Sequence, residues 1–410
     1  MNSALPSDLI ISGMGVVSPI GIGIDAFRTG LLRGDHRFAI MQRPGRQTED
    51  SAFLGAECGE IHLPRVPARV LRACSLPGKA ALAALDEAWQ NARLDGVDPS
   101  RIGLIIGGSN LQQRELTLTR QKYAERLAFL RPTYAMTFLD SDLCGLCTDL
   151  FPIRGFAYTL GGASAAGQLA VIQAADAVAS GRVDVAVAVG ALMDLSFWEC
   201  AGFRAAGAMG SERFAEAPEQ ACRPFDEQRD GFIFGENCAA LVVERAETSA
   251  QRGAAPRGLL RGTAVVMDGN RYPNPNADGE VRVIREALQA ADLKPGEIDY
   301  INPHGTGSPL GDKTESEALL QCGLEHAPLN TTKSLTGHGL CAAGAVEIAA
   351  TLVQMEAGRL HPSRNLDAPM NGALNFVGAT ARVQNVHNAL CLSYGFGGVN
   401  TAVCLQNPRG

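Results

Sequence analysis

The chain has 410 residues, 46% of them hydrophobic and 19% charged, which is the make-up of a packed α/β enzyme and excludes a disordered or fibrous protein. Its net charge of −7 argues against a nucleic-acid surface, and no stretch approaches the roughly 20 apolar residues of a membrane span. The N-terminus MNSALPSDLIISGMG lacks the basic start and cleavage site of a signal peptide, so we expect a cytoplasmic protein with no nucleic-acid or membrane partner.

The first expected strand covers residues 9–12 and leads into two glycines, Gly13 and Gly15, which predict a tight turn. This segment superficially resembles a dinucleotide-binding loop. Its third small residue is a serine, and Asp25 follows too soon to bind a ribose, so the pattern favours a turn over a cofactor site.

Nearly continuous apolar runs predict further strands that are buried on both faces. They lie at residues 102–106, 183–189, 238–243, 300–302 and 389–393. Residues 162–181 and 337–350 are rich in small and aliphatic residues on every side, which predicts two buried central helices. Two such helices suit a duplicated core. Glycine and proline at residues 251–256 place the boundary between halves at 1–255 and 256–410.

Two segments between the expected strands carry their own signals. Residues 112–134 hold several basic residues and predict an amphipathic helix that reaches a partner subunit or simply presents a solvated face. Cys144 and Cys147 have the C-x-x-C spacing of zinc and redox sites. No second Cys or His pair lies at zinc-site spacing, so we expect no metal and interpret the eleven scattered cysteines as reduced, mostly buried thiols.

Chemically capable residues gather at the ends of expected strands and the starts of central helices, where α/β proteins usually hold active sites. The segments are GGASAAG around Ser164, NPHGTGSPLGD around His304, and TTKSLTGHGLCAAG around Lys333 and His338. A fourth, LSYGFGGVN, is a glycine-rich loop whose backbone N–H groups would approach a ligand closely. Each alone is more often explained by packing or by a structural histidine, so the interpretation depends on their combination.

In this order the segments resemble the β-ketoacyl-acyl carrier protein synthases, or ketosynthases, over nearly the whole chain, from SGMGVVSPIG through RPFDEQRDGFIFGE to SYGFGGVN. The resemblance implies the α/β thiolase fold, in which two halves of similar topology form five αβαβα layers and the protein is a homodimer. It implies no cofactor of the enzyme's own, because the substrate is carried on the phosphopantetheine arm of an acyl carrier protein.

The resemblance also assigns roles to residues. In ketosynthases a cysteine at the start of the first central helix attacks the acyl thioester, and two histidines stabilise the enolate formed when malonyl is decarboxylated. The histidines correspond to His304 and His338, and the family's lysine and glutamate correspond to Lys333 and Glu315, whose pairing is also compatible with a structural salt bridge.

Three further positions match the family's substrate contacts. Thr306 and Ser308 match the phosphopantetheine-binding positions, although the second is commonly threonine, and Phe396 matches a phenylalanine whose backbone N–H helps form the oxyanion hole. Arg65, Arg69 and Arg72 are candidates for docking the acidic carrier protein, with a solvated face as the alternative.

The departure from the family is the nucleophile, because Ser164 stands where the cysteine is expected. A thiol becomes a thiolate readily at a helix N-terminus, whereas a serine hydroxyl needs a neighbouring base. Both histidines are expected to donate hydrogen bonds to the substrate oxygen, so neither is free as that base. We therefore expect decarboxylation to survive and condensation to be lost.

The serine at position 164 occurs together with the segments GGSNLQQRE, FLRPTYA and GALMDLSFWEC. In these features the chain resembles the malonyl-acyl carrier protein decarboxylases of polyketide β-branching. The resemblance implies that acetyl-acyl carrier protein passes to an enzyme that resembles hydroxymethylglutaryl-CoA (HMG-CoA) synthase. Two alternatives stay open. One is a non-catalytic partner subunit resembling chain-length factors, which usually lose the histidines as well, and the other is an acyltransferase that forms an ester on Ser164.

Overall fold

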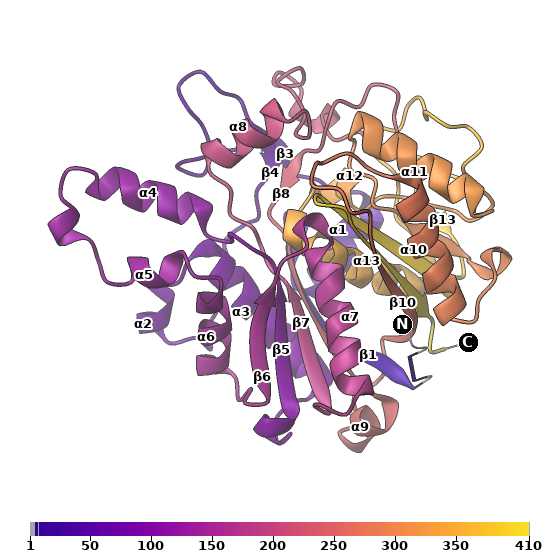
Figure 1. The fold of residues 1–410 in the computed structure, drawn as a ribbon, viewed down its shortest axis with the longest axis horizontal. Helices are drawn as coiled ribbons and strands as arrows, with labels where there is room; N and C mark the ends of the chain where they lie inside the picture. The colour runs from indigo at the N-terminus through magenta and orange to yellow at the C-terminus, as the bar shows by residue number, and fades with distance from the viewer. Residues whose placement is uncertain (1–4, 7, 410) are drawn as a thin grey trace.

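Strands from both ends of the chain join in one ten-stranded sheet in the computed structural model, which describes residues 5, 6 and 8–409 (Figure 1). The order is β11-β14-β15-β10-β1-β9-β7-β5-β6, with β2 paired to β1. The first half contributes β1 (Leu9–Ser18), β2 (Gly21–Ile22), β5 (Ile102–Gly107), β6 (Phe156–Leu160), β7 (Val185–Gly190) and β9 (Cys238–Arg245). The second half contributes β10 (Gly258–Met267), β11 (Tyr300–Asn302), β14 (Asn388–Gly395) and β15 (Val399–Gln406).

The two halves repeat one topology. The pair β1 and β9 is antiparallel, as is the pair β10 and β15. The next pair outward is antiparallel in both halves, and the one after it, β7 with β5 and β14 with β11, is parallel in both. The halves meet through a short pairing of Ile10 and Ile11 with Leu259 and Gly258. The duplication that the two central helices indicated is therefore present in the strand order as well.

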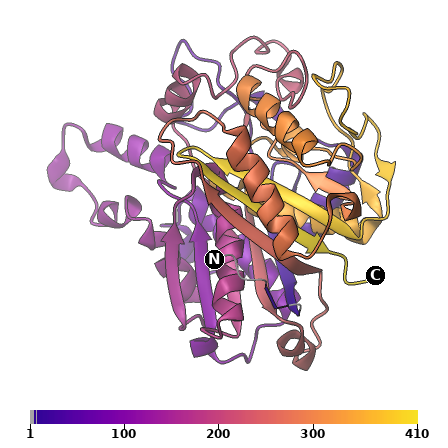
Figure 2. The same cartoon turned by 45° about the vertical axis from the view of Figure 1, so that its right-hand side comes forward.

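Helices complete the five layers. Helix α3 (Leu76–Ala92) covers β1 and β9, and α10 (Ala277–Ala290) covers the equivalent strands β10 and β15. Helices α7 (Ala166–Ala179) and α13 (Ala343–Ala357) pack against each other between the two halves of this sheet, as the views in Figure 1 and Figure 2 show. This arrangement confirms the predicted α/β fold with duplicated αβαβα layers. The stretch Leu340–Ala357 is long and apolar enough to cross a membrane, but 89% of it is buried inside the protein.

The central helices approach through glycine. A Cβ atom on Gly167 would lie 2.7 Å from the carbonyl oxygen of Cys341, and one on Gly344 would lie 2.6 Å from the Cβ of Gln168. A larger residue at either position would overlap its neighbour, so this close contact explains the small-residue composition. Because the N-termini of both helices carry candidate site residues, the contact also brings those residues together.

The predicted turn at Gly13 and Gly15 is wrong, because β1 continues through both glycines to Ser18. A Cβ on Gly13 would lie 2.3 Å from the carbonyl oxygen of Ala88, and one on Gly15 would lie 2.1 Å from that of Ala84. Both contacts are with α3. The glycines therefore let a helix lie directly on the strand, a use of glycine that the local sequence does not distinguish from a turn.

The other predicted elements are present with shifted ends. Each expected strand lies within an observed strand or overlaps one, and the predicted linker follows α9 (Ala246–Gln251) and precedes β10. Gly181 ends the first central helix with a φ of 71°, as expected of a C-terminal glycine. The remaining elements are α1 (Ile24–Arg33), α2 (Ala68–Leu71), α8 (Phe197–Ala205), α11 (Pro309–Gln321), α12 (Lys333–Thr336), β3 (Phe38–Ile40), β4 (Leu54–Ala56), β8 (Phe234–Gly235), β12 (Arg359–Leu360) and β13 (Arg382–Val383).

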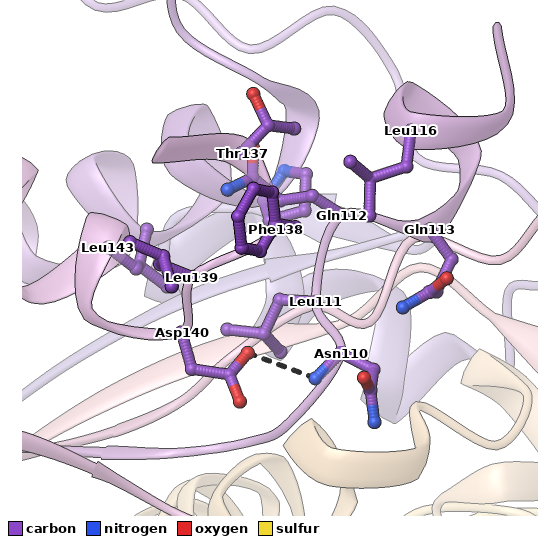
Figure 3. A pocket seen from close by; sticks show the side chains of 11 residues that line it. Asn110, Leu111, Gln112, Gln113, Leu116, Thr137, Phe138, Leu139, Asp140 and Leu143 are labelled. Carbon is purple, nitrogen blue, oxygen red and sulfur yellow. Dashed lines mark hydrogen bonds between the residues drawn. The ribbon is translucent and has the colours of Figure 1, made fainter. Parts of the chain in front are cut away.

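An arm projects from the first half, at the left of Figure 1. It contains α4 (Gln113–Tyr123) and α5 (Tyr134–Thr137) and returns to the body through α6 (Ser141–Leu150). The predicted amphipathic helix therefore ends early, and an irregular segment with exposed apolar side chains follows it. Figure 3 shows the hollow between the arm and the body, where Phe138 and Leu139 lie near Leu111 and the Asp140 carboxylate accepts the Asn110 N–H at 3.0 Å.

All eleven cysteines are free thiols, and all but Cys74 are buried. Cys144 and Cys147 lie on α6, where the Cys144 sulfur is 3.3 Å from the Thr159 hydroxyl oxygen. Burial raises the pKa of both thiols. The C-x-x-C spacing is therefore compatible with the packing of one helix face.

Candidate active site

One cavity of about 190 Å³ collects residues from both halves of the chain. Its lining includes all but one of the candidate catalytic and phosphopantetheine-binding residues, namely Ser164, His304, Thr306, Ser308, Glu315, His338 and Phe396. Lys333 lies behind this lining and is 1% exposed. The three polar segments and the glycine-rich loop therefore meet at one place, as the sequence indicated.

Ser164 lies in a short 3₁₀ turn, Ala163–Ala165, that leads from the edge strand β6 into α7. Ala163 has a φ of 46°, in the left-handed region that costs a non-glycine residue about 1–2 kcal/mol. The equivalent turn before α13 repeats this feature at Leu340, with a φ of 50°. The turn directs Ser164 into the cavity, where its Oγ lies 2.9 Å from Nε2 of His338.

The two histidines lie edge to face, with ring centroids 5.6 Å apart. Burial lowers the pKa of both imidazoles well below the usual value, and the positive charge of Lys333 adds to the effect. Both rings are therefore neutral, and each keeps one N–H donor. No residue in the described part of the chain bonds to Nδ1 of either ring, and both rings line the cavity.

Two buried ionisable residues hold the main chain of His304. Glu315 on α11 accepts the N–H groups of His304 and Gly305, each at 2.7 Å. Lys333 donates from Nζ to the carbonyl oxygen of His304. The salt bridge of Lys333 is with Glu347 on α13, rather than with the Glu315 that the resemblance paired with it. Burial raises the pKa of Glu315 to about 8.

The loop that follows His304 is held by another buried acidic side chain, Asp312. Asp312 accepts the N–H groups of Thr306 and Gly307, at 3.0 and 3.1 Å, and that of Phe225 at 2.6 Å. Ser308 caps α11 by accepting the Gly311 N–H at 3.3 Å. Thr306 and Ser308 thus have local structural partners while they also line the cavity, and their part in substrate binding stays a prediction.

Phe396 lies at the turn between β14 and β15 and is 43% exposed. Its ring centroid is 6.4 Å from that of Phe203, which also lines the cavity. Gly397 and Gly398 follow it with φ values of 89° and 79°, which a residue with a side chain rarely adopts. The glycines are thus needed for this turn, and the oxyanion-hole role of the Phe396 N–H stays a prediction.

Three functional-site residues were missed in the sequence. Glu347 could have been recognised from the sequence, because it is the one charged residue in the apolar segment CAAGAVEIAA. Glu280 and Tyr394 also belong to the site and line the cavity. Glu280 carried no signal, since an acidic residue in the first turn of a helix is ordinary, and Tyr394 lies in the segment LSYGFGGVN, which was singled out for its glycines rather than for this side chain.

Comparisons with known proteins agree with this geometry. Residues 7–249 match the family described as "Beta-ketoacyl synthase, N-terminal domain", and residues 257–367 match its "C-terminal domain". The chain is 53% identical over 401 residues to the "Polyketide biosynthesis malonyl-ACP decarboxylase PksF" of Bacillus subtilis (strain 168), covering 98% of this chain and 96% of that protein.

Solved structures show the same fold. A beta-ketoacyl synthase from Burkholderia phymatum superposes with a TM-score of 0.87 at 25% identity, over 98% of this chain and all of that one. A type II polyketide synthase (PKS) ketosynthase, solved as AntDE:AntF in complex with its acyl carrier protein, superposes with a TM-score of 0.85 at 26% identity, again over 98% of this chain and all of that one.

Proposed function

This chain belongs to the β-ketoacyl synthase family, and from that premise we propose that it is a malonyl-acyl carrier protein decarboxylase that releases acetyl-acyl carrier protein without condensation. The observation that carries the proposal is the neutral pair His304 and His338 facing Ser164, with no thiol at the nucleophile's position. The relative at 53% identity bears the name of that activity.

The chemistry follows from what the site offers. The thioester oxygen of the malonyl group accepts hydrogen bonds from the two imidazole N–H groups and from the backbone N–H of Phe396. The bond between C2 and the carboxylate carbon breaks, CO₂ leaves, and the electron pair moves onto that oxygen as an enolate. Fixed donors stabilise the developing charge, and the loss of one such donor typically costs about 10²–10³ in rate. A proton then adds to C2 and gives the acetyl thioester.

The acyltransferase alternative has one observation in its favour, the 2.9 Å contact between Ser164 Oγ and His338 Nε2, which is the spacing of a nucleophile and its base. Two features oppose it. The lowered pKa of His338 makes its imidazole a poor proton acceptor, and no described residue orients the ring from Nδ1 as the third member of a triad does. An acyl adduct on Ser164 would revive this alternative.

The chain-length-factor alternative predicts a protein that binds and shapes a ketosynthase without doing chemistry. The intact arrangement around His304 argues against this alternative, because Glu315 and Lys333 both form hydrogen bonds with the main chain of that residue. Isolation of the chain only as a heterodimer with a cysteine-bearing ketosynthase would revive it.

The pathway role extends this proposal. An acyl carrier protein presents the substrate on its phosphopantetheine arm past Thr306 and Ser308, and acetyl-acyl carrier protein passes in the cytoplasm to an enzyme resembling HMG-CoA synthase for polyketide β-branching. The solved complex of a ketosynthase with its carrier protein supports the docking step. Of the candidate docking arginines, Arg65 already forms an ion pair with Asp86. The functional halves are residues 1–255, with Ser164, and 256–410, with both histidines.

The homodimer is also part of the proposal. Strand β6 lies at one edge of the sheet, and all its residues are at least partly exposed, so it offers unpaired backbone groups to a second copy. Beside it the arm exposes large apolar side chains. They are Leu127, Phe129, Met136, Phe138 and Leu139. Burial of this apolar set by the partner's equivalent region would form a two-fold interface.

The test is to incubate the purified protein with malonyl-loaded acyl carrier protein and to follow the intact masses of both proteins. Conversion of the carrier to its acetyl form, with the enzyme mass unchanged, is the expected result. An unchanged malonyl-carrier would overturn the decarboxylase in favour of the partner-subunit reading, and an acyl group on Ser164 would overturn it in favour of the acyltransferase.

A further inference from the structure

An acidic side chain lines the cavity with one carboxyl oxygen that no described residue hydrogen-bonds. Glu280 is in the first turn of α10, is 1% exposed, and lines the cavity together with His304. Its Oε2 is buried and has no hydrogen-bond partner among the described residues. A buried polar atom left unpaired is costly, so such a group usually has a use in binding or catalysis.

Tyr394 lines the same cavity and lies beside the histidine. Its ring centroid is 5.5 Å from that of His304, and its hydroxyl is buried without a hydrogen-bond partner in the described part of the chain. Glu280 is the first of the charged neighbours that raise the pKa of this hydroxyl. Tyr394 and Glu280 are thus two polar side chains that line the same cavity as His304, each with a buried oxygen that no described residue pairs.

The surroundings of Glu280 disfavour its charged form. Burial raises its pKa well above the usual value, and the charges of Glu315, Asp268, Asp312 and Glu317 raise it further. All four of these neighbours are acidic. Burial among these groups thus favours the neutral, protonated form of the side chain, which is the form that can act as an acid.

The proposed reaction requires such a proton. A ketosynthase enolate attacks an acyl group on the enzyme, whereas here the enolate must be protonated at C2. His304 and His338 are committed to the enolate oxygen. Resting on the proposed function, we propose that Glu280 is the general acid that protonates C2 of the acetyl enolate, directly or through the Tyr394 hydroxyl.

The step balances without any further reactant. Loss of CO₂ from the malonyl carboxylate leaves the electron pair on the enolate, and a C2–H bond forms as the Glu280 O–H bond breaks. Glu280 becomes a carboxylate and regains its proton from solvent. The net reaction consumes one proton for each malonyl group and yields acetyl thioester and CO₂.

The test uses the full-length enzyme and malonyl-loaded acyl carrier protein. Glu280→Gln keeps the shape of the side chain but has no acidic proton, and we expect acetyl formation to fall about 10²-fold while the solvent deuterium isotope effect rises. Asp278→Asn removes an exposed carboxylate from the same helical turn and serves as the matched control. In Glu280→Ala, added formate should restore part of the rate by entering the vacated space.

Each outcome is decisive. A Glu280→Gln enzyme with the wild-type rate and isotope effect would overturn the proposal. So would a rate loss that comes with a lowered melting temperature, an unchanged isotope effect and no rescue by formate, since that pattern means a structural role. A wild-type enzyme that leaves malonyl-carrier unchanged would instead show that the proposed function itself is wrong. The proposed role of Glu280 would then be wrong as well.

Discussion

Ser164 Oγ and His338 Nε2 lie 2.9 Å apart at the N-terminus of the first central helix, where the family carries a thiol. The same contact would activate a cysteine, because a thiol gives up its proton far more readily than a hydroxyl does. With a serine it joins two neutral groups. An oxygen atom in place of sulfur at position 164 thus leaves the hydrogen-bond donors of the site in place and removes the thiol.

Restoring that atom should restore a reactive thiol. All eleven native cysteines have a raised pKa from burial, so they should react slowly with iodoacetamide. In Ser164→Cys the new thiol faces the cavity at a helix N-terminus, and we expect rapid addition of one carbamidomethyl group at position 164. Peptide mass spectrometry of both proteins measures it. Equal labelling of variant and wild type would contradict this reading of the position.

The buried pair of Lys333 and Glu347 should matter for stability. Glu347→Ala leaves the Lys333 ammonium buried without its partner, and we expect the free energy of unfolding to fall by about 3–5 kcal/mol in urea titrations. The control is Glu317→Ala, which breaks an exposed pair with Lys313 on α11 and should cost less than about 1 kcal/mol. Similar losses in the two variants would show that the buried pair contributes no more to the free energy of unfolding than the exposed pair does.

Glu315 predicts a pH dependence of stability. Its pKa is about 8 in the folded protein and near 4.5 when unfolded, so between these values the folded state binds more protons and stability falls as pH rises. Glu315→Gln removes this contribution. The stability of the wild type relative to the variant should therefore decrease from pH 5 to pH 8, by at most about 1.4 kcal/mol per pH unit. Urea titrations at several pH values measure it, and a constant difference would contradict the assignment.

The apolar arm predicts a dimer that polar substitution disrupts. Phe129 and Phe138 are 74% and 54% exposed, and burying two such rings on each copy contributes several kcal/mol to association. The double variant Phe129→Glu, Phe138→Glu should sediment as a monomer at concentrations where the wild type is a dimer. Because both side chains are exposed, the fold should be unaffected, and far-UV circular dichroism checks this. A variant that remains dimeric would place the interface elsewhere.

The catalytic segments could be predicted because their residues are clustered in sequence motifs. Ser164, His304 and His338 each lie in a glycine-rich segment beside an apolar run, and the structure places all three in one cavity. The buried strands were predicted for the same reason, since an apolar run has few other interpretations.

The features that were missed depend on contacts between distant segments. Gly13 and Gly15 contact α3, about 70 residues away in sequence, and only that contact shows that they are packing glycines. Glu347 pairs with Lys333 across two helices, and Glu280 on α10 raises the pKa of the hydroxyl of Tyr394 on β14. Short-range patterns carry no information about such partners, which are set by the fold.

The central claim is that the histidines, and not the Ser164 hydroxyl, carry the reaction. The most direct measurement is the initial rate of acetyl-carrier formation from malonyl-carrier by wild type, Ser164→Ala and His304→Ala at equal enzyme concentration. We expect Ser164→Ala to stay within about tenfold of wild type, and His304→Ala to lose about 10²–10³ in rate. A Ser164→Ala enzyme that is inactive beside a His304→Ala enzyme that still works would contradict the account.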